Sequence, residues 1–303
     1  KDKNGQEVID EEKCIHCGKC IVACPFGAIV EHSHIPHVLP KIKEGKDTVA
    51  LVAPALAGQF KASMSQMIEA LKALGFTHVL EVAEGADKTI SHESAEFSER
   101  MGNQAPLMTT SCCPAYVELT QKHLNGLASY ISSTPTPMHY AAQQAKACFP
   151  QAQTVFIGPC IGKKAEARKD DTVDYVMNFE ELGAWMIAAG IDVQKMPGEK
   201  VEWKATAEAA GFAASGGVTH AIQARLKNPE ALQATIINGI DKDSLKVLKK
   251  AARGKSEGNF MEVMACEHGC IGGCSTISLP RIAKKQLNKH LKEKQPLNAP
   301  KPA

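Results

Sequence analysis

The chain has 303 residues, of which 44% are hydrophobic, so it is long enough for one large domain or two ordinary domains with their own cores. A formal net charge of +2 and an aromatic content of 5%, with no basic run interleaved with aromatic residues, argue against nucleic-acid binding. The apolar stretch at residues 49–60 is too short for a membrane span and is broken by Pro54 and Gly58. No secretory signal is visible.

The cysteine content indicates metal ligation. Eleven cysteines is an odd count, and their tight spacing suits thiolate ligands in a reducing compartment better than a framework of disulfides. We therefore expect a cytoplasmic protein without a nucleic-acid or membrane partner.

The first cysteine group lies near the N-terminus. Its four members have the spacing of a bacterial ferredoxin run for a 4Fe-4S cluster and are Cys14, Cys17, Cys20 and Cys24. Residues 1–45 are therefore predicted to form a small α+β ferredoxin-like unit. In two-cluster ferredoxins the fourth cysteine of such a run ligates the other cluster. Cys24 thus implies either a partner motif upstream of Lys1, with the unit truncated at its N-terminus, or an unusual single-cluster arrangement.

Residues 46–283 show alternating strand and helix patterns. A buried strand is predicted at Thr48–Ala53, a helix follows with apolar residues at helical spacing from Met64 to Leu74, and Gly75 ends it. Val79–Ala83 is the next expected strand. Further strands are predicted near residues 107–109, 155–158, 175–177, 235–238 and 261–264. This order predicts an α/β region of two lobes, with parallel or mixed sheets flanked by helices. Residues 284–303 are expected to form a basic C-terminal helix and tail.

The remaining cysteines of interest follow predicted strands. Cys112 and Cys113 come after the strand ending near Thr109, Cys160 after the one ending near Gly158, and Cys266 after the one ending near Met264. Ligands bind beyond the carboxyl ends of parallel strands, so these cysteines are expected to meet between the lobes. Pro114 suits the first turn of a helix, which places Cys113 beside partly positive amide groups.

Three segments resemble the signature segments of iron-only (FeFe) hydrogenases, in the order of that family. They are Thr110-Ser111-Cys112-Cys113-Pro114, Pro159-Cys160-x2-Lys163-x2-Glu166 and Glu262-Val263-Met264-Ala265-Cys266-x3-Cys270. The ferredoxin-like stretch from Cys14 to His34 and a glycine-rich turn at Phe212–Val218 also match. The similarity extends from about Cys14 to about Ile282.

The resemblance implies a composite cofactor, the H-cluster. In it a 4Fe-4S cube is joined through a cysteine sulfur to a two-iron unit with CO, cyanide and a bridging dithiolate amine. The residues implied to hold the cube are Cys113, Cys160, Cys266 and Cys270, with Cys270 as the bridge. Lys163, Glu166 and Met264 are expected beside the two-iron unit. The expected cofactor-binding residues around it are Ala53, Pro54, Pro159, Gly272, Gly273 and Cys274.

Cys112 is expected to hold no iron and to move protons, since a thiol with a reference pKa of about 8.5 can exchange protons near neutrality. The proton path implied by the resemblance maps onto Glu93, Ser132, Glu96 and Arg100. The helix-spaced acidic and basic residues of this set could equally form a salt-bridged surface face.

Several positions depart from the family pattern. Ala55 stands where a serine is common, Gly158 where a methionine is common, and Met138 where glutamine or histidine is frequent, while Cys274 interrupts a run of glycines. Loss of a hydroxyl near cyanide removes a hydrogen bond of about 1.5 to 3 kcal/mol. These changes suggest a divergent, sensory branch. Cys148 is expected to be a small core residue.

Three functions remain open on sequence grounds. The first is an enzyme interconverting protons, electrons and H2, and the second is a regulatory H2 sensor with slow turnover. The third is a hydrogenase-like iron-sulfur assembly factor, although such relatives generally lack the first cysteine of the Cys112-Cys113 pair. The expected partners are a redox protein such as ferredoxin, hydrogenase maturation proteins and, for a sensor, a signalling partner.

Overall fold

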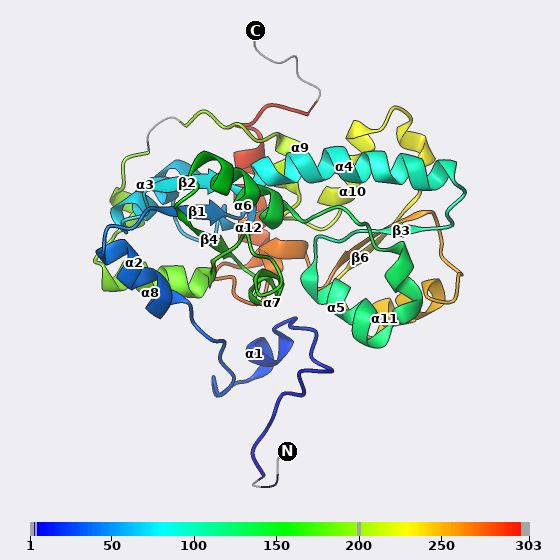
Figure 1. Cartoon of the computed structure of the whole chain (residues 1–303), viewed down its shortest axis with the longest axis horizontal. Helices are drawn as coiled ribbons and strands as arrows, with labels where there is room; N and C mark the ends of the chain where they lie inside the picture. Colours follow the sequence, from blue (N-terminus) through cyan, green and yellow to red (C-terminus); the bar gives the residue numbers. More distant parts are fainter. Residues whose placement is uncertain (1–2, 4, 199–200, 298–303) are drawn as a thin grey trace.

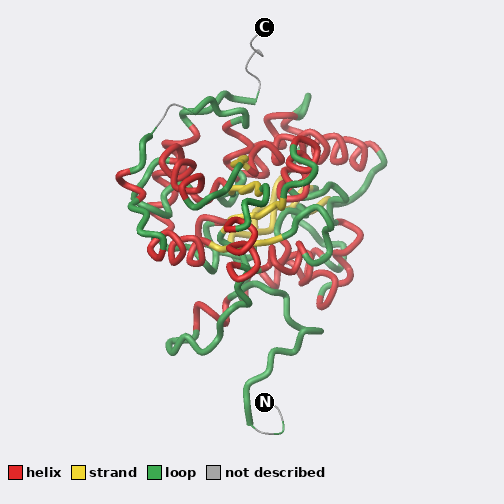
Figure 2. Tube along the Cα trace, turned by 60° about the vertical axis from the view of Figure 1, so that its left-hand side comes forward, coloured by secondary structure: helices red, strands yellow, loops and turns green. Residues whose placement is uncertain are grey.

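The structure, a computed structural model, describes residues 3, 5–198 and 201–297. Its body consists of two lobes that lie side by side, and the N-terminal segment with α1 (Lys19–Ala23) lies beneath them in Figure 1. The strands occupy the middle of the body and helices surround them, as Figure 2 shows. One parallel sheet flanked by helices in each lobe confirms the predicted fold class.

The first lobe is built on a four-stranded parallel sheet in the order β2-β1-β4-β5. Its strands are β1 (Thr48–Val52), β2 (His78–Glu81), β4 (Gln153–Gly158) and β5 (Tyr175–Asn178). The register places Val52 of β1 opposite Ile157 of β4. The helices of this lobe are α2 (Ile35–Lys43), α3 (Met64–Ala73), α6 (Pro137–Cys148), α7 (Gly162–Ala167) and α8 (Phe179–Ala188).

The second lobe contains a three-stranded parallel sheet in the order β3-β7-β6. Its strands are β3 (Met108–Thr109), β6 (Ala234–Asn238) and β7 (Phe260–Met264). The helices around it are α5 (Pro114–His123), α9 (Ala207–Gly211), α10 (Gly217–Arg225) and α11 (Lys242–Ala251). The long helix α4 (Val82–Gly102) packs on α6 of the first lobe and on α9 and α10 of the second, so it links the two lobes.

The described part of the chain also contains short 3-10 turns. They are η1 (Pro54–Leu56), η2 (Asn125–Tyr130), η3 (Val193–Lys195), η4 (Pro229–Ala231) and η5 (Gly269–Gly272). Within the described part of the chain, no helix combines the length and apolar character that a bilayer span requires.

The strands form where the sequence is apolar on both faces. Every residue of β1 and of β7 is buried, which is typical of parallel strands covered by helices on both sides. Helix α3 begins at a capping box in which Ser63 and Gln66 each accept a hydrogen bond from the other's backbone amide. Gly75 follows this helix with a φ of 103°, as expected for a helix-ending glycine.

The structure differs from the sequence-based expectation in several places. Val82 and Ala83 begin helix α4 and are not strand residues, because the chain turns from β2 directly into the helix. The described part of residues 1–45 contains α1 and α2 but no strand, so the strands expected for that unit are absent there. Helix α2 packs into the core of the first lobe through Val38, which is fully buried.

The C-terminal helix also starts earlier than expected. Helix α12 spans Pro280–Leu291, and its Ala283 and Leu287 are buried in the core of the first lobe. The buried Lys294 Nζ lies 2.6 Å from Glu81 Oε2, which fixes the chain beyond the helix. The expected tail at 298–303 lies outside the described residues.

Candidate active site between the lobes

The three cysteine segments meet at one cavity between the lobes. Cys112 and Cys113 follow β3, Cys160 follows β4 and Cys266 follows β7, as the carboxyl-end rule predicts. The empty space in this cavity is about 820 Å³ when its part open to solvent is included. Its lining includes all four cysteines implied to hold the cube, namely Cys113, Cys160, Cys266 and Cys270.

The cysteines around the cavity are free thiols, and burial raises the pKa of each of them. A bound metal would displace these thiol protons, and its positive charge would stabilise the buried thiolates. Among the described residues, the ligand atoms close enough together for a single ion are those of Glu11, Cys14 and His16 in the N-terminal unit. The cavity cysteines are spread more widely, which fits a cluster of several iron atoms better than one ion.

Cys113 occupies the N-cap position of α5, and Pro114 is the first residue of that helix. The proline confirms the expected helix start, since its missing amide hydrogen is not needed there. The partial positive charge of the helix N-terminus therefore lies beside Cys113 and favours a thiolate or an anionic cluster.

Lys163 brings a positive charge into a cavity lined mainly by apolar side chains. Burial alone would lower the pKa of Lys163, but the ion pair with Glu166, at 2.7 Å, raises it, so the ammonium stays charged. Glu166 also accepts a hydrogen bond of 2.5 Å from the Thr136 hydroxyl. A fixed ammonium can only donate hydrogen bonds, so this position suits an anionic or cyanide-bearing group. Glu166 itself lies behind Lys163 and holds it in place.

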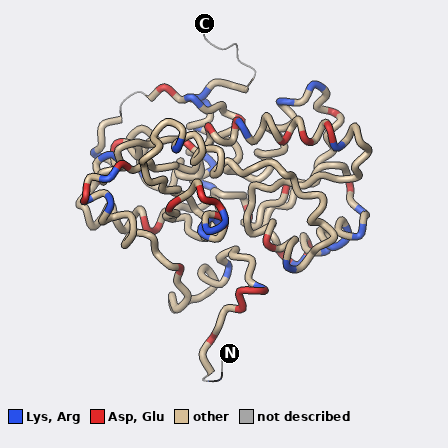
Figure 3. Tube along the Cα trace, in the orientation of Figure 1, with Lys and Arg blue, Asp and Glu red and all other residues tan. Residues whose placement is uncertain are grey.

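The charges at this position are visible in Figure 3, where acidic and basic residues of α7 form a blue and red group near the middle of the molecule. Lys163 and Lys164 are both buried. Adjacent lysines in the sequence would ordinarily be expected to be solvated. Their burial, with each paired to a carboxylate, shows that this short helix is part of the site and not a solvent-facing turn.

Glu93 is the most unusual side chain of the expected proton path. It is completely buried on α4, where the Ser132 hydroxyl and the Ser111 amide approach its carboxyl group without forming a hydrogen bond of normal geometry. Burial, reinforced by the charges of Glu96 and Glu262, raises the pKa of Glu93 to about 8. Burial and the nearby charge of Glu93 also raise the pKa of Cys112. A buried carboxyl group whose pKa is raised toward neutrality is suited to proton exchange and unsuited to a salt-bridged surface face.

The outer part of the path is an ordered hydrogen-bond group. The Ser132 hydroxyl donates to Glu96 Oε2 at 2.7 Å, and Arg100 Nη2 lies 2.7 Å from Glu96 Oε1. Burial would raise the pKa of Glu96, but amide and hydroxyl donors around it, including Ser133, lower it to about 2. Glu96 therefore remains ionised at neutral pH, whereas Glu93 can titrate.

The loops around the cavity place most of the other expected residues. Met264, Ala53, Pro54, Pro159 and Gly273 line the cavity, whereas Gly272 and Cys274 lie outside its lining. The departures Ala55 and Met138 line it as well.

Gly158 is explained by its neighbour. A Cβ atom at Gly158 would lie 2.7 Å from Cζ of Phe156, whose ring fills the space that a larger side chain at 158 would need. Phe156 itself lines the cavity. Cys148 is exposed at the end of α6, so the expectation of a small core residue is wrong.

Three residues with structural roles at the site were not given these roles from the sequence. Thr136 binds Glu166, and its position before Pro137 was a recognisable N-cap signal. Glu262 accepts from the amide of Gly216 at 2.7 Å and from that of Thr219 at 2.8 Å, so it fixes the glycine-rich turn before α10. Lys164 pairs with Glu181 at 3.0 Å, a contact that no local pattern indicates.

The N-terminal cysteine unit is much less enclosed. Cys20 is exposed, and the amide of Ala28 donates to Cys24 Sγ at 3.4 Å. This amide and that of Phe26 lower the pKa of the Cys24 thiol. The amide of His16 donates to Cys14 Sγ at 3.4 Å. Backbone amides directed at cysteine sulfurs suit thiolate ligands of an iron-sulfur cluster.

Comparison with known proteins agrees with this geometry. Residues 46–274 match the family model "Iron only hydrogenase large subunit, C-terminal domain", and residues 7–30 match "4Fe-4S binding domain". The chain is 29% identical to the periplasmic [Fe] hydrogenase large subunit of Nitratidesulfovibrio vulgaris, an alignment covering 90% of this chain and 87% of that one. It is 28% identical to iron hydrogenase 1 of Clostridium pasteurianum, over 95% of this chain and 61% of the relative.

Other relatives carry a different name. The cytosolic Fe-S cluster assembly factor narfl of Xenopus tropicalis is 24% identical, over 90% of this chain and 73% of its own length. Among solved structures, a variant of the [FeFe]-hydrogenase HydA1 of Chlamydomonas reinhardtii has the same fold, with a TM-score of 0.65 and 22% identity. That match covers 84% of this chain and 88% of the other. Because the family model spans most of the chain, including all three cavity segments, the chain belongs to the iron-only hydrogenase large-subunit family.

Proposed function

We propose that the protein interconverts protons, electrons and H2 at an H-cluster held in the cavity between the lobes. The observation that carries this proposal is Glu93. Its fully buried carboxyl group, with a raised pKa, lies between Cys112 and the Ser132–Glu96–Arg100 group, where a structural protein would have no reason to retain it.

In this proposal the residues that would hold the 4Fe-4S cube are Cys113, Cys160, Cys266 and Cys270, and Cys270 would also bind the two-iron unit. When bound, the cofactor supplies the site for H2 formation and cleavage. Lys163, held by Glu166, donates a hydrogen bond to an anionic ligand of the two-iron unit. Met264 and the loop residues Ala53, Pro54 and Pro159 exclude water around it.

Proton movement is assigned to Cys112 and Glu93. The Cys112 thiol lines the cavity and can give or accept a proton there. Glu93 exchanges that proton with the Ser132 hydroxyl, through small side-chain movements or an intervening water. The fixed charge of Glu96, balanced by Arg100, stabilises a proton on its way to the surface.

Two other functions follow from particular features. Apolar Ala55 and Met138 in the lining leave the cofactor with fewer hydrogen bonds, which favours slow turnover and a sensory use of H2 with a signalling partner. The assembly-factor function is suggested by relatives such as narfl. Cys112 and the buried Glu93 argue against it, because the handling of preformed clusters needs no proton path.

The proposed partners are a ferredoxin-type electron donor and hydrogenase maturation proteins. Free thiols at all eleven cysteines suit a reducing compartment, so we propose a cytoplasmic location.

The test is H2 evolution and H2 uptake by the chain loaded with both iron units, at saturating low-potential electron donor. We expect turnover in the wild type and near-complete loss in Cys112→Ala. Cys148→Ala is the control, because this exposed cysteine lies outside both ligand sets. Slow turnover at saturating donor would favour the sensory function. A fully loaded chain without H2 chemistry would overturn the proposal.

A further inference from the structure

The loop that carries Cys17 is in direct contact with the segment that follows the cavity. Gly18 has a φ of 74°, and a Cβ atom there would lie 2.6 Å from Cβ of Cys274 and nearer still to its sulfur. Ile161 Cδ1 would be 3.4 Å away. Position 18 therefore needs glycine for its backbone conformation and also for this close approach.

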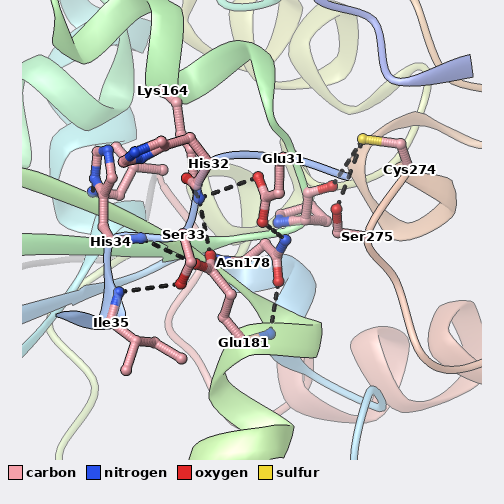
Figure 4. A network of polar contacts seen from close by, with 12 residues as sticks. Glu31, His32, Ser33, His34, Ile35, Lys164, Asn178, Glu181, Cys274 and Ser275 are labelled. Atoms are coloured by element: carbon pink, nitrogen blue, oxygen red, sulfur yellow. Dashed lines mark hydrogen bonds and ion pairs between the residues drawn. The ribbon is translucent and has the colours of Figure 1, made fainter. Parts of the chain in front are cut away.

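On its other side, the Cys274 thiol is tied to the residues that flank Cys160. It donates to the carbonyl oxygen of Pro159 at 3.7 Å and accepts from the amide of Ile161. The amide of Ser275 also donates to Pro159, at 3.1 Å. Figure 4 shows the Cys274 sulfur with its dashed contacts beside Ser275. The side chain of Cys274 thus lies between Gly18, next to Cys17, and the backbone on both sides of Cys160.

A second glycine lies in the same contact. A Cβ atom at Gly162 would lie 3.2 Å from the carbonyl oxygen of His16 and 3.4 Å from the sulfur of Cys160. We call the contact formed by His16, Gly18, Gly162 and Cys274 the cysteine seam. Both sides of the seam use glycine where the backbones approach each other, which is expected where close approach is required.

Within the N-terminal unit, the segment after the cysteine run is fastened to the first lobe. Lys164 Nζ lies 3.1 Å from Glu31 Oε2 and 3.0 Å from Glu181 Oε2, and it donates to the carbonyl oxygen of His32 at 2.8 Å. Asn178 donates a hydrogen bond to Glu31, and Figure 4 shows these side chains as one network of polar contacts. Two sets of contacts therefore hold the N-terminal unit against the first lobe: the seam itself and this ion-pair group.

The seam also brings cysteines of the two groups together. Burial is the main cause of the raised pKa of Cys266, and the charges of other cysteines add to it, among them Cys274 and Cys17. Cys17 therefore lies within electrostatic reach of a cavity cysteine. Because the Cys274 thiol is packed between the segments that carry Cys17 and Cys160, its size affects the distance between the clusters bound to these two cysteines.

We propose that Cys274 is a positioning residue for electron transfer, which sets the spacing between the cluster ligated by Cys17 and the cube ligated by Cys160 and Cys266. The step is the passage of one electron from the reduced N-terminal cluster to the oxidised cube, without making or breaking a bond. An external one-electron donor, such as dithionite, reduces the N-terminal cluster. The inference rests on the iron-sulfur part of the proposed function and not on its hydrogen chemistry.

The experiment compares the wild type, Gly18→Ala and the double variant Gly18→Ala/Cys274→Gly, each loaded with both 4Fe-4S clusters and lacking the two-iron unit. Electron paramagnetic resonance of the dithionite-reduced protein reports the magnetic coupling between the clusters. We expect coupling in the wild type and its loss in Gly18→Ala, where the new methyl group pushes the loop off Cys274. The double variant should regain it, because the sulfur that the methyl group would meet is gone.

The design separates contact from backbone strain. Gly18→Ala and the double variant carry the same strain at a positive φ, so their difference reports the contact with Cys274 alone. Cys274→Ser keeps the hydrogen bonds and should keep the coupling, and Cys148→Ala is the control for loss of a cysteine. If Gly18→Ala does not fold, Cys274→Met enlarges the same contact from the other side and should also lose the coupling.

Two results would overturn the inference alone. One is coupling that persists in Gly18→Ala, or in Cys274→Met, with both cluster signals intact. The other is a loss of coupling that the double variant does not restore. Absence of one cluster signal from the wild-type chain would instead overturn the ligand assignment in the proposed function, and this inference with it.

Discussion

The two cysteine groups are organised in opposite ways. The cavity between the lobes is formed by strand ends, and its four cysteines lie among buried side chains of both sheets. In the N-terminal unit, α1 contains no buried residue, Cys20 is exposed and Phe26 is 90% exposed. The body therefore shapes a site before any cofactor arrives, whereas the N-terminal loop has little core of its own and gains more of its order from a bound cluster.

Removal of iron should separate the two regions most clearly. Chelation under reducing conditions should lower hydrogen-exchange protection in residues 7–30 far more than in the strands, because that loop has few buried residues and relies on its cluster and on a few contacts with the body. The amides of β1, β4 and β7 should keep their protection, since these strands are buried by packing. Hydrogen exchange followed by mass spectrometry measures both regions in one sample. Equal loss of protection in both would contradict the comparison.

Within the cavity, substitutions of Cys112 and of Cys113 should have different effects on H2 turnover and on iron content. Cys112→Ser should lower H2 turnover by about 10² to 10⁴ while leaving iron content near that of the wild type, because it removes a proton-transfer group. Cys113→Ala should lose the cube. Iron analysis and H2 assays on the same preparations decide this. Iron loss of the same size in both variants would show that the division of roles is wrong.

Glu93→Gln tests the buried part of the proton path. We expect a turnover loss of about 10² with intact iron content. The same variant should change the pH dependence of stability. The folded protein holds the Glu93 proton up to a pKa of about 8, whereas the unfolded chain releases it near 4.5. The folded state therefore binds more protons between these values, and Glu93 makes it less stable as pH rises through that range.

The glutamine variant lacks this titration. Its stability relative to the wild type should increase from about pH 5 to about pH 8, as measured by urea unfolding of the iron-free protein. A constant difference over that pH range would show that Glu93 is not held protonated in the folded state.

The smallest expected effect concerns the ion-pair group that joins the two regions. Lys164→Gln leaves Glu31 and Glu181 without their shared hydrogen-bond donor, so we expect a loss of about 2 kcal/mol in unfolding free energy. Burial, together with Glu181, raises the pKa of Glu31 to about 7. Below that pH Glu31 is neutral, so the loss should be smaller at pH 5.5 than at pH 8. Lys169→Gln, at a mainly exposed lysine, is a matched control.

The sequence was sufficient where the information is local. Strands such as β1, β4 and β7 were predicted because short apolar runs end at turn residues, and the carboxyl-end rule then placed Cys112, Cys160 and Cys266 together. The start of α4 at Val82 was missed because the apolar residues Val82 and Ala83 fit the end of a strand and the start of a helix equally well. Cys148 was misjudged because it lies at the solvent-exposed end of an otherwise buried helix.

The rest of the site depends on contacts between distant residues. Lys164 meets Glu31 across the chain, and Gly18 meets Cys274, so no local pattern could reveal either pair. The buried state of Glu93 was also beyond sequence reasoning, since its helical spacing with Glu96 and Arg100 fits a surface face equally well. Only the packing of α4 between the lobes decides that question.

Infrared spectroscopy of the chain loaded with the two-iron unit tests the central claim most directly. CO and cyanide absorb in a region free of protein bands, and Lys163 should hold a cyanide-bearing group in the cavity. The account predicts these bands in the wild type, with shifted cyanide bands in Lys163→Met. A chain that carries a complete cube, shown by its paramagnetic signal, yet gives no CO or cyanide bands after loading would contradict it.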